Sequence, residues 1–127
     1  MGLGQRICIA SASAGANVVG TARRSCKETE DKIRELGGNF TELIADLSDF
    51  AVIPRIMKEA SKAYGRVDIL VNNAGVIKRC GAVDVTLQDW ELVVDLNQKM
   101  VFFLSQAFAK TWIADQGGER SLISPPC

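Results

Sequence analysis

The chain has 127 residues, 47% of them hydrophobic, which is enough for one domain with a buried core. Fifteen basic residues balance fifteen acidic ones, so we expect no electrostatic footprint for nucleic acid or for an anionic lipid surface. No apolar run approaches the roughly 20 residues that a membrane helix requires, and the first residues are not those of a signal peptide, so we expect a cytoplasmic protein without membrane attachment.

Helix and strand patterns alternate along the chain. Apolar residues at helical spacing predict helices, and short apolar runs bounded by glycine or polar residues predict strands. The expected order is a helix at 5–14, a strand at 16–22, a helix from Ser25 to Gly37, a strand at 40–45, a helix from Ser48 or Asp49 to Tyr64, a strand at 67–71, and one bent helix or two helices between Thr86 and Ile113. Strands that are apolar on both faces and alternate with helices indicate a parallel sheet covered on both sides.

Capping signals place several helix ends. Ser25 and Glu28 have the Ser-x-x-Glu spacing of a capping box. Gly15 is expected to end the first helix and Gly37 the second, because glycine tolerates the conformation that closes a helix. Pro54 is compatible with the third helix only if it lies within or close to the first turn.

Two glycine-containing segments suggest where a ligand would bind. In parallel α/β sheets ligands bind at the carboxyl ends of the strands, and Asn72-Asn73-Ala74-Gly75 follows the strand expected at 67–71. Gly2-Leu3-Gly4 opens the first helix, where glycines let the backbone approach a pyrophosphate. Each segment has a plainer interpretation. The first glycines are equally compatible with a flexible tail. For the asparagines the alternative is ordinary turn chemistry.

Taken together, these motifs resemble the short-chain dehydrogenase/reductase family over essentially the whole chain. The resemblance rests on Gly2-Leu3-Gly4, on Asp46-Leu47 after a strand, on N-N-A-G at 72–75 after D-I-L-V, and on Asn97 in D-L-N. N-N-A-G is its most specific part. The runs D-I-L-V-N-N-A-G-V-I-K-R, D-W-E-L-V-V-D-L-N and V-F-F-L-S-Q-A-F-A-K are similar to the 2-deoxy-D-gluconate 3-dehydrogenase branch of that family.

The resemblance implies a fold and a reaction. The fold would be α/β, a partial Rossmann-like doubly wound parallel sheet that lacks the first strand and the C-terminal half. Residues 1–118 would form an incomplete dinucleotide-binding domain and residues 119–127 a divergent tail. The implied activity is that of an NAD(P)-dependent oxidoreductase acting on a sugar acid such as 2-deoxy-D-gluconate. The alternative is a catalytically inactive, truncated product that acts as an interaction module for related subunits.

The resemblance also implies a set of cofactor-binding residues. Asp46 would hydrogen-bond the adenine with Leu47 beside it, and residues 72–75 would pass beneath the adenine-proximal ribose. The alternative for Asp46 is a cap on the helix that begins near Ser48. The implied set is Gly2, Leu3, Gly4, Arg23, Asp46, Leu47, Asn73, Ala74 and Gly75.

The residues at the end of the strand expected at 16–22 bear on the choice between NAD and NADP, and they leave it open. Ala22 stands where the family often has an acid that binds the ribose hydroxyl of NAD. Arg23 and Arg24, which follow it, would suit the 2′-phosphate of NADP. The branch named above is usually associated with NAD, so the cofactor is NAD or NADP.

The catalytic residues of the family are only partly present. Asn97 matches the family's catalytic asparagine, which holds a helix irregularity and a water in a proton relay; an ordinary polar residue on a helix face is the alternative. The family's tyrosine and the lysine four residues after it are absent, because the single tyrosine, Tyr64, is followed by Asp68 and precedes N-N-A-G. Ser124 falls near the place of the family's serine, but the two prolines after it make that role doubtful. We therefore expect the chain alone to be inactive.

Other features suggest partners. The helix at 99–113 matches the helix through which the family commonly forms tetramers, and its apolar residues are Val101, Phe102, Leu104, Phe108 and Trp112. The resemblance thus implies homo-oligomers through this helix; the alternative is a helix that packs on its own sheet. Lys78 and Arg79 could meet a sugar-acid carboxylate; the alternative is a solvated charged turn. The four cysteines have no Cys-x-x-Cys spacing and no histidine exists, so neither a zinc site nor a disulfide scaffold is expected.

Overall fold

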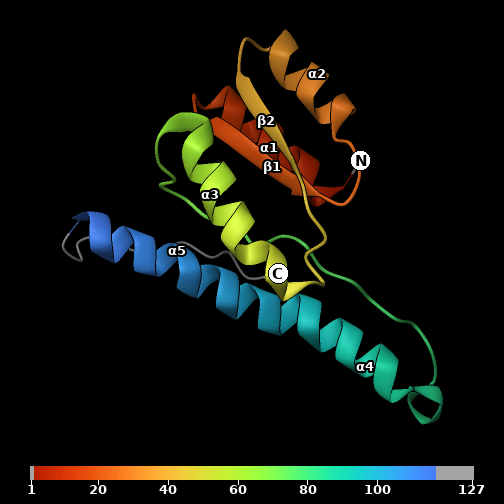
Figure 1. The fold of residues 1–127 in the computed structure, drawn as a ribbon. Coiled ribbons are helices and arrows are strands. Elements are labelled where there is room, and N and C mark those ends of the chain that lie inside the picture. The colour runs from red at the N-terminus through yellow and green to blue at the C-terminus, as the bar shows by residue number, and fades with distance from the viewer. Residues whose placement is uncertain (1, 117–127) are drawn as a thin grey trace. The chain divides into compact units, whose positions relative to one another are not determined.

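The computed structural model describes residues 2–116, which divide into two compact units. Unit 1 comprises Met1–Asp46 with Pro54–Val67, and unit 2 comprises Leu47–Ile53 with Asp68–Cys127. The elements in chain order are α1 (Leu3–Ser13), β1 (Asn17–Ala22), α2 (Lys27–Glu35), β2 (Asn39–Ile44), the short 3₁₀ turn η1 (Phe50–Val52), α3 (Ile53–Tyr64), the 3₁₀ turn η2 (Ala82–Asp84), α4 (Leu87–Val94), the π-helical turn η3 (Asp95–Lys99) and α5 (Met100–Gln116) (Figure 1).

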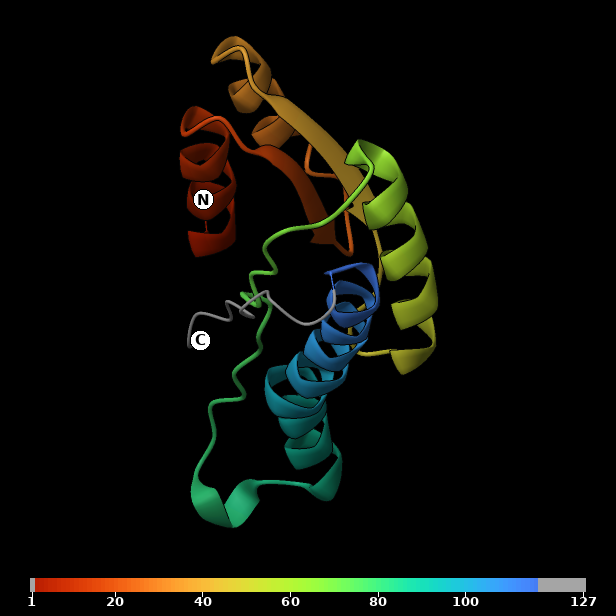
Figure 2. The ribbon, with the colours of Figure 1, turned by 90° about the vertical axis from the view of Figure 1, so that its left-hand side faces the viewer.

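Unit 1 contains the sheet. β1 and β2 pair in parallel, from Asn17 opposite Asn39 to Ala22 opposite Ile44, which confirms the predicted parallel α/β fold. Figure 2 shows α1 on one side of the two strands and α3 on the other. The small side chains and branched aliphatics of this unit supply its core, which consists of Ala12, Ile33, Leu43, Ala45, Ile56 and Ala60, all at most 7% exposed.

The predicted helix ends at glycine are confirmed. Gly15 has φ of +95° and follows Ala14, the C-cap of α1, and Gly37 has φ of +76° and follows Leu36, the C-cap of α2. Residues with a Cβ rarely adopt this left-handed conformation, so glycine at these positions closes each helix at little cost. The tight turn at Gly15 sends the chain straight back into β1.

The capping box predicted from Ser25 and Glu28 is wrong. The N-cap of α2 is Cys26, and its side chain makes no capping bond. Instead, the Ser25 hydroxyl donates to Glu42 Oε2 at 3.2 Å, and the Cys26 backbone N–H donates to the same oxygen. Glu28 accepts a hydrogen bond from Lys32 at 2.6 Å, which lowers the pKa of the Glu28 carboxyl. A carboxylate from β2 has therefore replaced the local cap.

Of the two residues predicted to open the helix that contains α3, the structure agrees with Asp49. Asp49, and not Ser48, acts as the cap of η1, because its Oδ1 accepts a hydrogen bond of 3.0 Å from the backbone N–H of Ala51. η1 leads directly into α3, and Pro54 is the second residue of that helix. Its missing N–H is one that the first turn leaves unpaired in any case.

The strand predicted at 67–71 is not present. Residues 66–79 form no regular element, and within residues 2–116 the sheet consists of β1 and β2 alone. A strand is defined by hydrogen bonds to a neighbour, and no described strand pairs with this segment. The apolar run that predicted a strand is instead partly exposed, with Ile69 at 58%.

In unit 2, α4 and α5 follow one another through η3 as one continuous helical stretch, so of the two predicted forms the single helix is present, interrupted by a π turn (Figure 1). Thr86 caps α4, since its Oγ1 accepts a 3.1 Å hydrogen bond from the Asp89 N–H. The apolar residues expected to form one assembly face on α5 are divided: Leu104, Phe108 and Trp112 are at most 7% exposed, whereas Phe102 is 61% exposed. None of the described helices has the length and apolar character needed to cross a membrane.

Candidate functional site

Asn97 lies within η3, the π-helical turn between α4 and α5. A π turn inserts one residue into the helix and such turns are frequent at functional sites. The helix irregularity that the family resemblance implied at Asn97 is therefore present. Asn97 itself is half-buried.

The carboxamide of Asn97 holds the backbone of Val76. The Val76 N–H donates to Asn97 Oδ1 at 2.8 Å, and Asn97 Nδ2 donates to the Val76 carbonyl oxygen at 2.9 Å. An N–H can only donate and a carbonyl can only accept, so this pair fixes the orientation of the carboxamide. A Cβ added to the preceding residue, Gly75, would lie 3.2 Å from Asn97 Oδ1, which leaves little room for any side chain there.

A second asparagine anchors the other end of the same segment. Asn72 is 8% exposed, and its Nδ2 donates to Ser105 Oγ on α5 at 3.1 Å. Residues 72–76, which we call the anchored segment, are thus attached at one end to α5 and at the other to η3. Asn73, Ala74 and Gly75 between the two attachments are exposed. This arrangement presents a short stretch of backbone with small side chains to a ligand.

In unit 1, the carboxyl edge of the sheet brings several predicted residues together. β1 and β2 are parallel, and the Ala45 N–H bonds the Ala22 carbonyl oxygen at 2.9 Å, so Arg23 and Asp46 follow the strands at the same edge. Because α1 turns back into β1 at Gly15 and packs against it, the residues Gly2-Leu3-Gly4 lie at that edge as well.

The polarity of this edge fits an anionic ligand. The N-cap of α1 is Gly2, which has no side-chain cap, and the first turn contains no acidic residue. Backbone N–H groups at a helix N-terminus are left without intrahelical partners and carry partial positive charge. A Cβ added to Gly2 would meet nothing within 4 Å, and Arg23 is exposed. A pyrophosphate requires donors of this kind.

The predicted cofactor residues are distributed over both units. Gly2, Leu3, Gly4, Arg23 and Asp46 belong to unit 1, whereas Leu47, Asn73, Ala74 and Gly75 belong to unit 2. Asp46 and Leu47 are consecutive in sequence and stand at the division between the units. That all nine line a single cofactor site stays a prediction.

Two further residues bear on catalysis: Tyr64, which does not match the family's tyrosine, and Ser124, which falls near the place of the family's serine. The hydroxyl of Tyr64 accepts a 2.9 Å hydrogen bond from Thr41 Oγ1, so it is engaged with β2 in unit 1, as a packing residue would be. Ser124 and the tail at 119–127 lie outside the described residues. Asn97 is consequently the catalytic candidate that the structure places.

The cysteines of unit 1 are not activated. Burial raises the pKa of the Cys8 thiol, and the nearby Cys26 raises it further. Burial, followed by the negative charge of Glu42, raises the pKa of Cys26. Thiolate is the nucleophilic form, so neither residue resembles a catalytic cysteine. Cys80 in unit 2 is exposed.

The sequence analysis did not predict two residues that contribute to the candidate site. Val76 contributes through its backbone, for which side-chain patterns give no signal. Ser105 could have been found, because it is a single hydroxyl within the apolar run V-F-F-L-S-Q, eight residues beyond Asn97 on the same helical region.

Comparison with known proteins identifies the family to which the chain belongs. The family model described as short chain dehydrogenase matches residues 1–121. The chain is 43% identical over 117 residues to the 2-dehydro-3-deoxy-D-gluconate 5-dehydrogenase of Escherichia coli strain K12, a match that covers 92% of this chain and 46% of that protein. The chain therefore spans about half the length of the curated relatives it matches.

Solved structures agree with this match. A crystal structure with bound NADP, of an Agrobacterium tumefaciens protein provisionally assigned as a 2-deoxy-D-gluconate 3-dehydrogenase, has a TM-score of 0.83 at 41% identity and covers 97% of this chain and 48% of that one. A metagenomic short-chain oxidoreductase in complex with NADP has a TM-score of 0.88 at 33% identity, with coverages of 98% and 57%. This chain belongs to the short-chain dehydrogenase family.

Proposed function

We propose that this chain binds a nicotinamide dinucleotide and forms the cofactor-binding part of an oxidoreductase for a sugar acid such as 2-deoxy-D-gluconate. The observation that carries the proposal is the anchored segment, which Asn72 and Asn97 attach to α5 and η3 while Asn73, Ala74 and Gly75 remain exposed. NADP bound in the structures of two relatives supports the cofactor, and the name of the Escherichia coli relative supports the substrate class.

The chain's own residues have distinct roles in this proposal. The N-terminus of α1 at 2–4 would receive the pyrophosphate, Asp46 and Leu47 the adenine, and residues 73–75 the ribose. A bound nicotinamide supplies the hydride chemistry, as cofactors do in such enzymes. Both polar atoms of the Asn97 carboxamide are engaged by Val76, so we expect Asn97 to hold the anchored segment in position; its part in a proton relay stays a prediction.

We infer that the 127 residues alone do not turn over substrate. Proton transfer to or from the alcohol requires a positioned acid or base with a suitable pKa. The single tyrosine of the chain, Tyr64, is bonded to Thr41, and Asp68 stands four residues after it where the family has lysine. Dehydrogenase activity would then need groups that this sequence does not contain.

The test is a titration of the purified chain with NADPH and with NADH, followed by nicotinamide fluorescence, with a thermal melt of the same samples. Saturable binding and a melting temperature that rises with dinucleotide concentration are expected, because a ligand that binds only the folded state stabilises it. Absence of binding to both dinucleotides in a chain that melts cooperatively would overturn the proposal. Turnover of 2-deoxy-D-gluconate by the chain alone would contradict the inferred inactivity.

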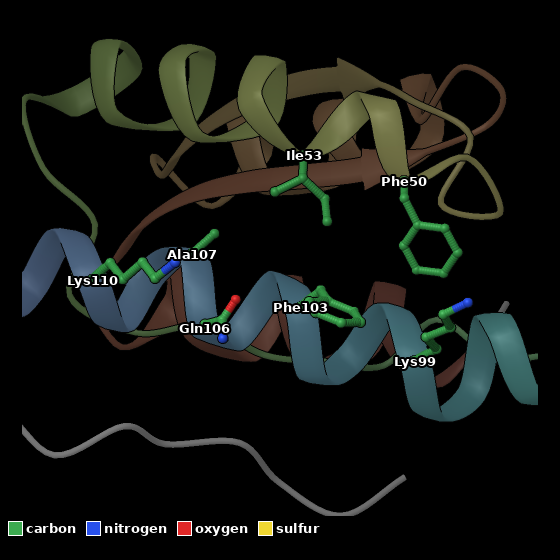
Figure 3. Close-up of a pocket in the computed structure, with 7 residues that line it drawn as sticks. All are labelled: Phe50, Ile53, Lys99, Phe103, Gln106, Ala107 and Lys110. Atoms are coloured by element: carbon green, nitrogen blue, oxygen red, sulfur yellow. The ribbon is translucent and has the colours of Figure 1, made fainter.

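A second function, assembly with other copies of the chain through α5, is favoured by a groove in unit 2. Phe50 and Ile53 face α5 across it, with Lys99 and Lys110 toward its two ends (Figure 3). Its volume is about 490 Å³, and its apolar lining includes Phe103, whose ring lies 6.3 Å edge-on from that of Phe50. Exposed apolar surface of this kind often marks a protein interface.

Sedimentation of matched variants tests this second function. Phe103 is 40% exposed, and Phe103→Glu would place a charge within the groove. Gln98→Glu adds the same charge at an exposed neighbouring position that does not line the groove. We expect oligomers in the parent chain and in Gln98→Glu, and monomers in Phe103→Glu. A monomeric parent chain at all concentrations would exclude self-assembly.

A further inference from the structure

A second, smaller cavity in unit 2 lies beside the anchored segment. It has a volume of about 150 Å³ and is lined by Lys78, Cys80, Val85, Asp89, Trp90 and Val93. Lys78 is two residues beyond Val76, whose backbone Asn97 holds, so their Cα atoms are at most about 7.6 Å apart. The cavity therefore opens next to the proposed cofactor-binding segment, between the loop that leaves it and α4.

The cavity contains a cation that is only loosely paired. Lys78 Nζ lies 3.7 Å from Asp89 Oδ1, beyond the 2.7–3.2 Å range of a hydrogen bond, and the Lys78 side chain is 49% exposed. The backbone of Asp89 is fixed in the first turn of α4, because its N–H is bonded to Thr86 Oγ1. A lysine ammonium has three donors, so Lys78 can receive a carboxylate without a change in backbone structure.

The wall of the cavity carries an exposed aromatic ring. Trp90 is 63% exposed although it is the larger of the apolar side chains there, and Val85 is 43% exposed. The carbon-bound hydrogens of a polyol chain form an apolar surface that can pack on such a ring through dispersion. A mostly apolar lining with a few convergent polar groups is typical of small-molecule sites.

These three features fit one end of a polyhydroxy acid. At about 30 Å³ per liquid water, 150 Å³ corresponds to roughly five waters, which suits one end of a small metabolite and not a dinucleotide. Lys78 would attract a carboxylate, whereas Asp89 would repel a second carboxylate and accept hydrogen bonds from hydroxyl groups. A ligand that bears one carboxylate and several hydroxyls satisfies both residues.

We propose that this cavity is the subsite for the carboxylate end of a polyhydroxy acid, with Lys78 donating to the carboxylate, Asp89 accepting from hydroxyls and Trp90 packing on the carbon chain. The inference rests on the proposed function, since it assigns one end of the same sugar-acid substrate to named residues. Arg79, the other residue that the sequence analysis offered for a carboxylate, is exposed and does not line the cavity, so it serves as the comparison for charge.

The experiment uses the two tryptophans as local probes. Trp90 lines the cavity and Trp112 is 5% exposed elsewhere on α5, so the ¹⁵N-labelled full chain should give two indole N–H signals, assigned with Trp90→Phe. The probes are D-gluconate and D-glucitol, which have similar hydroxyls but differ in the carboxylate. At 0.15 M ionic strength, gluconate should shift the Trp90 signal saturably and leave Trp112 unmoved. Glucitol should bind at least about tenfold more weakly, which is the effect of 1.4 kcal/mol.

Variants that remove a positive charge test whether Lys78 is responsible for the preference for gluconate over glucitol. Lys78→Met should abolish the preference for gluconate over glucitol, whereas Arg79→Met should leave the gluconate affinity within about twofold. A Trp90 signal that gluconate does not move would overturn the proposal. So would equal losses in the two variants, because that result indicates diffuse electrostatic attraction. Thermal melts of both variants confirm that each remains folded.

Parallel titration with NADPH separates this inference from the proposed function. Lys78→Met should bind NADPH as the parent chain does, because Lys78 lies outside the predicted cofactor set. If NADPH binds and gluconate does not, the subsite assignment fails and the cofactor function stands. If gluconate shifts Trp90 and neither dinucleotide binds, the cofactor function fails and the cavity is an acid-binding site of another kind.

Discussion

Asn97 and Val76 exchange two hydrogen bonds, of 2.8 and 2.9 Å, across 21 residues of sequence. The side chain of Asn97 thereby supplies one acceptor and one donor to a backbone that no described strand pairs. A neighbouring strand would supply the same two partners in a sheet. The π turn that contains Asn97 therefore acts as the structural support of the anchored segment.

Asn97→Ala is expected to lower the free energy of unfolding by about 1–3 kcal/mol, because both polar groups of Val76 lose a partly buried partner. Asn97→Asp should lose less than the alanine variant, since a carboxylate can still accept from the Val76 N–H but cannot donate to its carbonyl. Urea unfolding followed by circular dichroism measures both. Gln98→Ala, an exposed neighbour, should change stability by less than about 0.5 kcal/mol. Equal effects at the two positions would mean that the Asn97 pair contributes nothing.

Gly75→Ala tests the close approach beside the same pair. The added Cβ would lie 3.2 Å from Asn97 Oδ1, which the Val76 N–H holds and so prevents from moving away. We expect a loss of roughly 1 kcal/mol in the parent chain, as for mild overpacking. In the Asn97→Ala background the loss should fall by more than half, because the obstructing oxygen is gone. A double-mutant cycle on urea midpoints gives this coupling, and additive losses would show that Asn97 is not what restricts Gly75.

Local patterns predicted the parts of the fold that depend on a few consecutive residues. The glycines after α1 and α2 have the left-handed backbone that ends a helix, and Thr86 caps α4 through the Asp89 N–H. The strand predicted at 67–71 is not present, because a strand depends on a partner strand that can be distant in sequence and not on local residues alone. The capping box of Ser25 and Glu28 failed likewise, since the acceptor is Glu42, 16 residues beyond Cys26.

The site was predictable to a similar extent. The resemblance identified Asn97 and residues 72–75, and the irregular helix at Asn97 is present. It could not reveal that both carboxamide atoms of Asn97 are directed to the Val76 backbone, because a backbone partner leaves no mark in the sequence. Nor could it reveal the Asn72–Ser105 bond, which depends on how an irregular segment lies along α5.

Glu42→Ala is expected to weaken α2 more than either member of the predicted capping box. One Glu42 oxygen accepts from both the Ser25 hydroxyl and the Cys26 backbone N–H, so its removal should cost about 1–2 kcal/mol, as for loss of an N-cap. Ser25→Ala removes only one of the two donors and should cost less. Glu28→Ala should leave the start of α2 intact. Thermal melts of the three variants measure the order, and a larger loss for Glu28→Ala than for Glu42→Ala would contradict it.

Above about pH 9, the free energy of unfolding should decrease because the two thiols of unit 1 lose their protons more readily in the unfolded chain. Burial raises the pKa of Cys8 and of Cys26 above the ordinary thiol value of 9.0, so as pH passes that value the unfolded chain releases these protons first. The unfolded state then binds fewer protons than the folded state, and the free energy of unfolding decreases with pH. Melts from pH 7 to 10 should show a shallower decrease in Cys8→Ser/Cys26→Ser than in the parent chain. Parallel curves would mean that the thiols do not titrate differently on folding.

The arginine that follows β1 should decide the cofactor preference. Ala22 offers no carboxylate to a ribose hydroxyl, and exposed Arg23 can donate to a 2′-phosphate, so we expect NADPH to bind at least about tenfold more tightly than NADH. Arg23→Ala should weaken NADPH binding about tenfold and leave NADH binding nearly unchanged, because only NADPH carries the phosphate. Arg79→Ala removes an exposed arginine of unit 2 and controls for net charge. Fluorescence titrations at 0.15 M salt give the four affinities. An equal preference in the parent chain and in Arg23→Ala would assign the choice of cofactor to other residues.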